Sequence, residues 1–413
     1  MFPILEIGPL AIQAAGFFLL ISLAIGTWLT GKFSEALGTN TDAIENGVLI
    51  ILGVFLASAR LGFILQNPQT FLGNPSEIIS LSPRTLNIGF GILVSTLTAA
   101  SLTQRNHIPL WPTLDTLTPL IILITIGIHL ANLANGDGFG LETQLPWGLD
   151  LWGAKRHPVQ FYALILLGLY FIVHLLFTKR LSQTGFMRSG LLFSITAMAI
   201  AIIIILTRAF VAEKILIGNV DVGQLAGFFV LIGSLIIIYR IQYQGDKETE
   251  VILGVGSNIN PHANLTKGYE TLATDFKIVG SSSIYLTQAV KSQPDAQDYM
   301  NQTIALRAAM AFPDLYKHLK TIEKAFGREP GNKEVVPLDL DILTYGDQVF
   351  NFQGKQIPDP DLGKYRYIAE PLGEMSPNFR HPATGISIER ILDKIEDEAK
   401  ISKINEVDDG IKR

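Results

Sequence analysis

The sequence predicts a chain of two parts, an all-α membrane bundle of seven transmembrane helices followed by a soluble α+β domain. Charge separates the parts, because residues 1–246 hold 12 Lys or Arg and 12 Asp or Glu, whereas the 167 residues after them hold 20 and 25. Apolar runs of about 20 residues occur only in the first part, and alternating strand patterns occur in the second. We therefore predict domains at residues 1–246 and 247–398, and a disordered tail at residues 399–413.

Composition excludes several classes of protein. The chain has no cysteine, which excludes disulfide scaffolds, cysteine-ligated metal sites and thiol nucleophiles. The net charge of −5 belongs to the second part, because the charges of the first part sum to zero. Neither part has the basic excess of a nucleic-acid binder, so no nucleic-acid partner is expected.

Seven apolar runs are each close to the ~20 residues that cross ~30 Å of hydrocarbon. They lie at residues 10–29, 46–66, 86–103, 116–133, 159–177, 190–207 and 222–239. The densest positive loop contains Lys179, Arg180 and Arg188, and positive loops face the cytoplasm. Counting spans from this loop predicts an outside N-terminus and a cytoplasmic C-terminal domain. No Lys or Arg precedes Lys32, so we expect the first run to be retained and not cleaved as a signal peptide.

Polar residues inside these runs are candidates for a site. Arg60 and His129 lie within apolar runs, Arg208 closes one, and Asn132 and Asn135 follow His129 near the same helical face. Ionisable groups are costly in hydrocarbon and usually face a bundle interior or a cavity. The alternative is that these side chains form hydrogen bonds between helices.

Several short motifs in residues 1–240 resemble prolipoprotein diacylglyceryl transferases. In chain order they are Ile7-Gly8-Pro9-Leu10, Ala59-Arg60-Leu61-Gly62-Phe63, Asn132-Leu133-Ala134-Asn135-Gly136, Pro146-Trp147-Gly148, His157-Pro158-Val159-Gln160-Phe161-Tyr162, Arg208 and Gly223-Gln224-Leu225. The resemblance implies a multi-pass protein of the bacterial inner membrane that moves diacylglycerol from phosphatidylglycerol to a lipoprotein cysteine. It also implies that phosphatidylglycerol or another anionic lipid binds at Arg60, His129, Asn132, Asn135 and Arg208.

The same region departs from the family at three places. His129 stands where the family has an Arg, Asn87 where it has a His, and Ala14-Ala15 where it has two aromatic residues. Histidine lacks the planar fork with which Arg grips phosphate, and Asn cannot act as a base. These departures favour lipid binding over lipid transfer.

The second part has the element order of a ferredoxin-like fold. A buried strand at residues 251–253 enters a turn at residues 254–258, and helical patterns occupy residues 263–274 and 313–326. Alternating strands lie at residues 277–285, 301–308 and 337–343. The order βαββαβ predicts the ferredoxin-like arrangement.

Two aspartates in the last of these strands form a candidate metal site. The two-residue period places Asp339 and Asp341 on one face and Leu338, Leu340 and Ile342 on the other. Two carboxylates about 7 Å apart repel each other unless a cation lies between them, and Mg²⁺ accepts such a pair together with substrate phosphate oxygens. The alternative is a solvated strand face with two ordinary aspartates.

Motifs across residues 250–394 resemble 6-hydroxymethyl-7,8-dihydropterin pyrophosphokinase. They are Gly256-Ser257-Asn258, Ser282-Ser283-Ile284-Tyr285-Leu286-Thr287, Asp298-Tyr299-Met300-Asn301, Ile322-Glu323-Lys324-Ala325-Phe326-Gly327-Arg328, Leu338-Asp339-Leu340-Asp341 and Pro371-Leu372. The resemblance implies ATP, two Mg²⁺ ions and 6-hydroxymethyl-7,8-dihydropterin as partners. It implies metal-binding and catalytic roles for Asp339 and Asp341, a catalytic role for Arg328, nucleotide contacts for Glu323 and Arg328, and pterin contacts for Tyr299, Asn301 and Tyr367.

This part also departs from its family. Pro330 and Val336 stand where the family has arginines, and Asp359 stands where it has a phosphate-contacting His. Lys333, Lys364 and Arg366 are near enough in sequence to replace the missing cations. The sequence therefore predicts a membrane-tethered 2-amino-4-hydroxy-6-hydroxymethyldihydropteridine diphosphokinase fused to a transferase-like bundle. The alternatives are diacylglyceryl transfer by the bundle, or a lipid-binding scaffold with an inactive kinase-like domain.

Overall fold

The computed structural model describes residues 4–7, 10–73, 85–184, 188–244, 248–287, 298–329, 331, 334–396 and 401–404. The chain divides into two compact units. The first consists of Met1–Thr178 with Gly190–Tyr239, and the second of Lys179–Ser189 with Arg240–Arg413. The predicted domain boundary at residues 246–247 lies outside the described residues.

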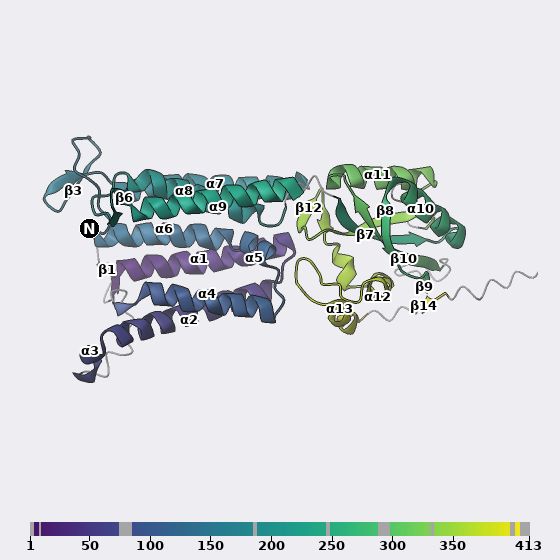
Figure 1. Ribbon diagram of the computed structural model, residues 1–413, viewed down its shortest axis with the longest axis horizontal. Helices are drawn as coiled ribbons and strands as arrows, with labels where there is room; N and C mark the ends of the chain where they lie inside the picture. Colours follow the sequence, from purple (N-terminus) through teal and green to yellow (C-terminus); the bar gives the residue numbers. More distant parts are fainter. Residues whose placement is uncertain are drawn as a thin grey trace, which may run out of the picture. The chain divides into compact units, whose positions relative to one another are not determined.

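The first unit is built from long helices that lie side by side (Figure 1). They are α1 (Ala14–Leu37), α2 (Thr41–Gln66), α4 (Ile88–Arg105), α6 (Thr118–Asn135), α7 (Val159–Thr184), α8 (Leu191–Arg208) and α9 (Val222–Gln244), with short helices α3 (Pro68–Gly73) and α5 (Leu110–Thr116) between them. Each of the seven predicted apolar runs coincides with one long helix.

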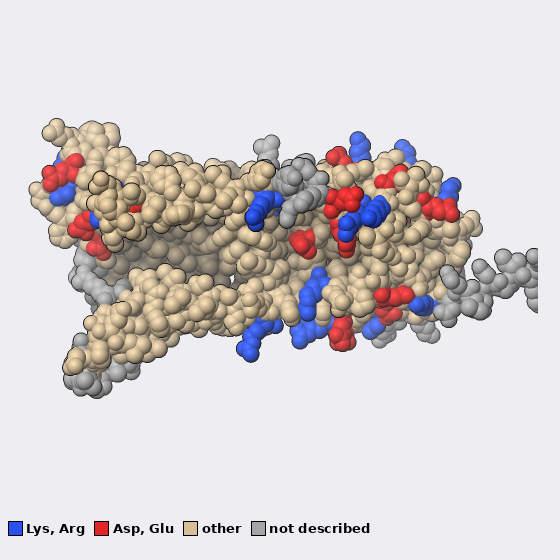
Figure 2. All heavy atoms as spheres, in the orientation of Figure 1, with Lys and Arg blue, Asp and Glu red and all other residues tan. Residues whose placement is uncertain are grey.

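Within the described residues, six of these helices are long and apolar enough to cross a membrane. The exception among the predicted seven is α4, so its crossing stays a prediction. Figure 2 shows a flank of this unit that carries almost no Lys, Arg, Asp or Glu, whereas charged side chains gather near the helix ends. An apolar flank between charged ends is the surface that a bilayer requires.

Short hairpins gather at one end of the helical unit (Figure 1). They are β1 (Ile4–Ile7) with β2 (Leu10–Gln13), β3 (Leu149–Leu151) with β4 (Ala154–Arg156), and β5 (Leu216–Ile217) with β6 (Val220–Asp221). The last two hairpins connect the C-termini of α6 and α8 to the N-termini of α7 and α9, which places predicted site residues on α6 and α8 near this end.

The second unit contains a six-stranded antiparallel sheet and its covering helices. Its strands are β7 (Thr249–Ser257), β8 (Lys277–Ser281), β9 (Tyr285–Thr287), β10 (Tyr299–Ala308), β11 (Asp339–Tyr345) and β14 (Ile401–Lys403). Its helices are α10 (Pro261–Asp275), α11 (Phe312–Ala325), α12 (Arg366–Met375) and α13 (Ile388–Lys394), and a separate hairpin pairs β12 (Phe350–Phe352) with β13 (Lys355–Ile357).

Strand β7 lies at the centre of this sheet, between β11 and β10. Strands β8 and β9 both pair with β10, and β14 pairs with β9. One face of the sheet packs against α12 and α13 through a core of Ile252, Leu343, Leu362, Ala369, Leu372, Ile388, Ile391 and Ile395. The predicted order of strands and helices from residue 251 to residue 343 is confirmed except at residues 277–285, where one predicted strand is two separate strands, β8 and β9.

Two predictions about this unit are wrong. Residues Ile401–Lys403, expected within a disordered tail, form β14 at the sheet edge, where the Lys403 Nζ lies 2.7 Å from Glu374 Oε1. The other tail residues lie outside the described part of the chain. Gly254 and Gly256, expected in a turn, lie inside β7, because both pair with β10 and β11 and the ladder with β10 continues to Ser257.

Candidate active site

Strand β11 presents its two aspartates on the face of the sheet opposite the buried Leu340 and Ile342. Asp339 pairs with Gly256 of β7, and Asp341 pairs with Gly254 two residues away. Paired residues of adjacent strands share one face, so each aspartate has a glycine as its neighbour. No side chain of β7 therefore fills the face of the sheet beside the two carboxylates.

Gly256 also separates the aspartates from a polar amide. It pairs on its other side with Asn301 of β10, and a Cβ built at Gly256 would lie 3.0 Å from Asn301 Oδ1. Glycine inside a strand marks a place where a ligand or another group comes close to the backbone. Here it leaves room between Asp339 and Asn301.

A cleft of about 490 Å³ lies over this floor. Its lining includes six of the seven residues that the sequence predicted for the kinase site: Tyr299, Asn301, Arg328, Asp339, Asp341 and Tyr367. A cavity of this size is typical of small-molecule sites. Residues from four separate segments, 299–301, 328, 339–341 and 367, thus come together in one cleft.

One side of the cleft combines aromatic rings with a fixed amide. Asn301 Nδ2 donates a 2.6 Å hydrogen bond to Thr287 Oγ1, which holds the amide in place. Thr287 was not among the predicted site residues. The rings of Tyr365 and Tyr367 stack with centroids 5.3 Å apart. Burial raises the pKa of Tyr299, so its phenol stays neutral. A flat heterocycle could stack here and hydrogen-bond to the amide.

The two aspartates differ electrostatically. Burial raises the pKa of Asp339 to about 6, and the negative charges of Asp341 and Glu323 add to this. Burial would also raise the pKa of Asp341, but the ammonium of Lys355 more than offsets it and holds that pKa below its ordinary value. The pKa values of two neighbouring carboxylates diverge in this way when the surroundings of the two groups differ.

Glu323 lies beneath the strand and not in the cleft. It is 3% exposed, and its Oε1 accepts hydrogen bonds from Leu340 N at 2.7 Å and from Lys320 Nζ at 2.7 Å. The predicted nucleotide contact is therefore replaced by a structural one, because the carboxylate is used to hold the backbone between Asp339 and Asp341.

The predicted replacement cations that the structure describes do not contact the aspartate pair, and an unpredicted lysine does. Lys364 pairs with Asp361, Arg366 pairs with Glu370, and Lys333 lies outside the described residues. In contrast, Lys355 Nζ lies 2.7 Å from Asp341 Oδ1 and 3.0 Å from Asp359 Oδ2. No sequence pattern pointed to Lys355, since only the hairpin of β12 and β13 brings it to these carboxylates.

The residues present fit a magnesium site. No group of three or more His, Asp or Glu is arranged for a metal anywhere in the described ranges. Mg²⁺ does not need one, because it is usually held by one or two carboxylates, with waters and substrate phosphates completing its shell. Asp339 and Asp341 supply such a pair, and Asp359 and Asp361 add negative charge to the same cleft lining.

In the helical unit, Arg60 is buried among aromatic rings. Its side chain is 6% exposed, its Nη1 donates to Thr85 O at 2.9 Å, and its guanidinium lies 5.1 Å from the ring centroid of Phe71. Nearby, Asn87 Oδ1 accepts from Phe90 N at 3.0 Å and so caps the N-terminus of α4. Asn87 thus has a structural use in place of the family's histidine.

His129 is tied to the loop after α6 through Gln160. The His129 Nδ1 lies 2.7 Å from Gln160 Oε1, and Gln160 Nε2 donates to the carbonyls of Asp137 and Gly138 at 3.0 and 3.1 Å. Because an amide oxygen only accepts, Nδ1 carries the proton. Asn132 lines a small cavity beside Gln160, and Asn135 donates to Asp137 Oδ2 at 3.2 Å.

Arg208 forms a two-pronged ion pair that the sequence did not predict. Its Nε and Nη2 lie 2.7 and 2.6 Å from the two carboxylate oxygens of Asp221, which is 3% exposed. Gly223 makes room for this pair, since a Cβ there would lie 2.6 Å from Arg208 Nε. Two of the three guanidinium nitrogens are therefore already bound to a protein carboxylate.

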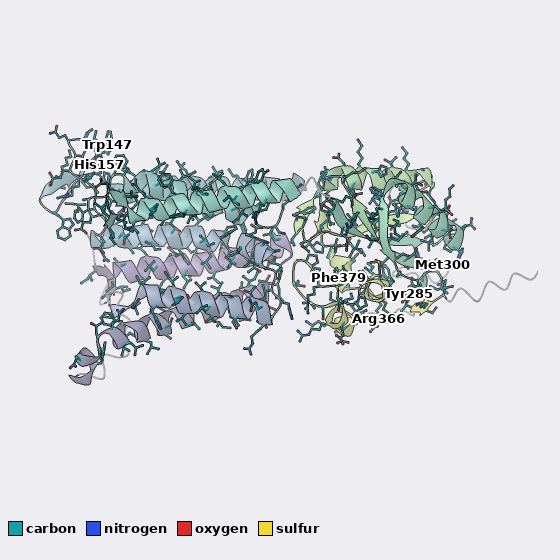
Figure 3. The ribbon with its side chains drawn as sticks, in the orientation of Figure 1. Trp147, His157, Tyr285, Met300, Arg366 and Phe379 are labelled. Carbon is teal, nitrogen blue, oxygen red and sulfur yellow. The ribbon has the colours of Figure 1, made fainter. Side chains whose placement is uncertain are left out.

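Aromatic and histidine side chains lie together at the hairpin end of this unit. Trp147 Nε1 donates to Tyr162 Oη at 2.9 Å, and His157 Nδ1 lies 3.3 Å from the same oxygen. Figure 3 shows Trp147 and His157 close together there. Both residues belong to motifs on which the sequence resemblance rested.

The fold and sites define a polytopic membrane protein that carries a separate domain with an acidic ligand cleft. Residues 3–240 match the family of prolipoprotein diacylglyceryl transferases, and the chain belongs to that family. Residues 252–377 match the family of 7,8-dihydro-6-hydroxymethylpterin-pyrophosphokinases. Both predicted resemblances are confirmed. Both families are transferases, and the six apolar helices together with the first family identify a bacterial membrane protein.

Individual relatives match one part or the other. The phosphatidylglycerol–prolipoprotein diacylglyceryl transferase of Thermus thermophilus is 35% identical over 35% of this chain and 52% of its own length. That of Nitratidesulfovibrio vulgaris is 30% identical over 44% of this chain and 72% of its own. The 2-amino-4-hydroxy-6-hydroxymethyldihydropteridine pyrophosphokinase of Synechocystis sp. is 29% identical over 35% of this chain and 75% of its own. The chain thus spans about half the length of the Thermus relative.

Proposed function

We propose that the C-terminal domain transfers the β,γ-diphosphate of ATP to the hydroxymethyl oxygen of 6-hydroxymethyl-7,8-dihydropterin, and so takes part in folate biosynthesis. The observation that carries this proposal is the single cleft that joins the aspartate pair and Arg328 to Tyr299, Asn301 and Tyr367. The acidic side suits a metal-bound polyphosphate, and the aromatic side suits a flat heterocycle. The match to the pyrophosphokinase family supports the same assignment.

In this reaction the hydroxymethyl oxygen bonds to the β-phosphorus, and the bond from that phosphorus to the oxygen bridging to the α-phosphorus breaks. AMP leaves with the electron pair, and the hydroxyl proton passes to water. Mg²⁺, of which we propose two ions at Asp339 and Asp341, supplies neutralisation of phosphate charge. Arg328 binds phosphate oxygens, and Tyr299, Asn301 and Tyr367 hold the pterin in reach of the phosphate.

The test is AMP release by the detergent-solubilised full chain supplied with ATP, Mg²⁺ and the pterin. We expect AMP only when all three are present, and a loss of at least about 100-fold in Asp341→Asn, since removing a charge-stabilising group costs about that much. Lys277→Met, an exposed change on β8, serves as the matched control. AMP release that survives Asp341→Asn would exclude the metal role of the pair.

We also propose the finer architecture on which this function depends. The sheet order β11, β7, β10, β8, with α10 and α11 in the connections, supports a ferredoxin-like fold for residues 247–398. Seven spans within residues 1–246 would tether this domain to the inner membrane with the N-terminus outside and the domain in the cytoplasm, where ATP is made available.

For the bundle we propose binding of phosphatidylglycerol or another anionic lipid at Arg60, His129, Asn132, Asn135 and Arg208. Family membership supports this site. Diacylglyceryl transfer to a lipoprotein cysteine is the second candidate function, and it is tested by incubating the full chain with phosphatidylglycerol and a cysteine-containing lipoprotein signal peptide. A peptide that stays unmodified while labelled phosphatidylglycerol is retained by the chain would support binding without transfer.

A further inference from the structure

Lys355 occupies a position between two carboxylates of the cleft. It begins β13, and the hairpin with β12 fixes its backbone through the pairing of Phe352 with Lys355. Its Nζ lies 2.7 Å from Asp341 Oδ1 and 3.0 Å from Asp359 Oδ2, and its side chain is 21% exposed. Both aspartates line the cleft, so the ammonium group lies within 3.0 Å of two cleft-lining carboxylates.

Lys355 and Arg328 flank the aspartate pair from different elements. Arg328 follows α11 and its Nε lies 4.0 Å from Asp339 Oδ1, whereas Lys355 approaches Asp341 from β13. Each carboxylate of the pair thus has one cation beside it. A polyphosphate chain placed over the pair would meet a positive charge at each end.

Asp359 gives Lys355 a second anchor and accounts for the charge at this position. The ammonium of Lys355 lies within 3.0 Å of both carboxylates, and each is an opposite charge beside it. If Asp341 binds a metal ion, the 3.0 Å contact with Asp359 still holds the ammonium beside the cleft. An aspartate here would repel phosphate if it stood alone, whereas an aspartate carrying a lysine presents a cation.

We propose that Lys355, positioned by Asp359, is a ligand for the phosphates of the bound nucleotide. This inference rests on the function proposed above for the same cleft. It assigns the cation missing from the position of Asp359 to a residue four positions earlier in the chain. Lys355 is favoured over Lys364 because it contacts Asp341 of the aspartate pair, whereas Lys364 contacts only Asp361.

The test is isothermal titration of the detergent-solubilised full chain with the magnesium complex of α,β-methylene-ATP, which cannot be cleaved at the reacting bond. Lys355→Met should weaken this binding by about tenfold or more, as expected for loss of a charged hydrogen bond. Lys355→Arg should restore most of the affinity because it returns a cation. Lys277→Met, at an exposed position of β8 outside the cleft lining, should leave the affinity within about twofold of the unchanged chain, which is the control.

Binding of AMP and of the pterin separates phosphate contact from a general disturbance of the domain. Both should be unchanged in Lys355→Met if the lysine acts on the β- and γ-phosphates. Equal loss of AMP, pterin and α,β-methylene-ATP binding would overturn the inference in favour of a structural clamp, as would unchanged α,β-methylene-ATP binding. Failure of the unchanged chain to bind the magnesium complex at all would instead contradict the proposed function.

Discussion

Gly256 is the residue whose missing side chain leaves room in the cleft beside Asn301. A Cβ at this position would lie 3.0 Å from Asn301 Oδ1, and it would project between that amide and Asp339. We expect Gly256→Ala to turn or displace the Asn301 amide and to lower pterin affinity by about tenfold, or about 1.4 kcal/mol. Titration of the full chain with the pterin measures this loss.

Gly363→Ala is a suitable control for that change, because a Cβ at Gly363 meets no atom within 4 Å. It should leave pterin affinity unchanged. The Gly256→Ala chain should still bind the magnesium complex of α,β-methylene-ATP, since Arg328 and Lys355 are untouched. Normal pterin binding by Gly256→Ala would show that the Asn301 amide does not hydrogen-bond to the pterin ring.

The sequence predicted side chains whose position depends on local periodicity, and it failed where position depends on distant packing. Asp339 and Asp341 share a face because strands alternate, and this follows from the sequence alone. Glu323 was assigned to the nucleotide because its motif lies beside Arg328, yet the packing of α11 under β11 turns it to Leu340 N. Lys355 reaches Asp341 only through a hairpin that no local pattern located.

At the scale of elements, strand β14 pairs with β9 and is also tied to α12 through one carboxylate. Glu374 accepts hydrogen bonds from Ser283 Oγ at 2.8 Å and from Tyr285 Oη at 2.9 Å, and Lys403 Nζ lies 2.7 Å away. Figure 3 labels Tyr285 on the strand that β14 joins. Burial alone would raise the pKa of Glu374, but these partners lower it to about 2.

This shift predicts that acid weakens the domain. The folded-state pKa of about 2 lies below the ordinary value of 4.5, so the ionised form is stabilised by folding. The contribution is fully present above about pH 4.5 and is lost as the pH falls toward 2. Calorimetry of the full chain in detergent should show the domain transition falling across this range, and Glu374→Gln should flatten that fall.

Glu329→Gln, at an exposed position, is the comparison for this measurement. It should leave the pH dependence of the domain transition as it is in the unchanged chain. An equal slope in Glu374→Gln and in the unchanged chain would mean that other carboxylates govern acid unfolding.

Helix α8 begins at a carboxylate supplied by another element. Asp115 of α5 is 2% exposed, and its two oxygens accept from Gly190 N at 2.6 Å and Phe193 N at 2.8 Å. Free N–H groups at a helix N-terminus favour such a negative partner. We expect Asp115→Ala to lower the free energy of unfolding of the bundle by about 0.5–2 kcal/mol, the usual cost of losing a cap.

Asp115→Asn keeps one acceptor and should recover part of that stability, whereas Asp42→Asn on the exposed surface of α2 should change little. Thermal unfolding of the chain in detergent measures the difference. Equal stability of the Asp115→Ala and unchanged chains would show that the cap is replaced by water.

At the scale of the whole molecule, composition was enough to separate the two parts. Hydrocarbon excludes charge over about 20 residues, so the helical unit is recognisable from its apolar runs without knowledge of packing. The edge strand β14 was not recognisable, because a three-residue segment has too little pattern of its own and forms only against β9. The number of spans is likewise undecided by composition, since α4 has the same 18 residues as α6 and α8 but is less apolar than they are.

Whether the number of spans is odd or even can be measured, because it decides on which side of the membrane each end of the bundle lies. Seven crossings place the two ends of the bundle on opposite sides of the membrane, and six place them on the same side. Helix α4 has 18 residues, or about 27 Å at 1.5 Å per residue, against the ~30 Å of hydrocarbon that it would have to cross. We expect it to cross, because Arg105 in its last turn can reach the cytoplasmic interface.

Reporters that are active on only one side of the membrane test this expectation. Green fluorescent protein should fluoresce when fused after residue 106 or after residue 246, and alkaline phosphatase should be active when fused after residue 66. Phosphatase activity after both residue 66 and residue 106 would mean that α4 does not cross. A phosphatase-active fusion after residue 246 would place the nucleotide cleft outside the cytoplasm, away from ATP, and would contradict the kinase function whatever the geometry of its aspartates.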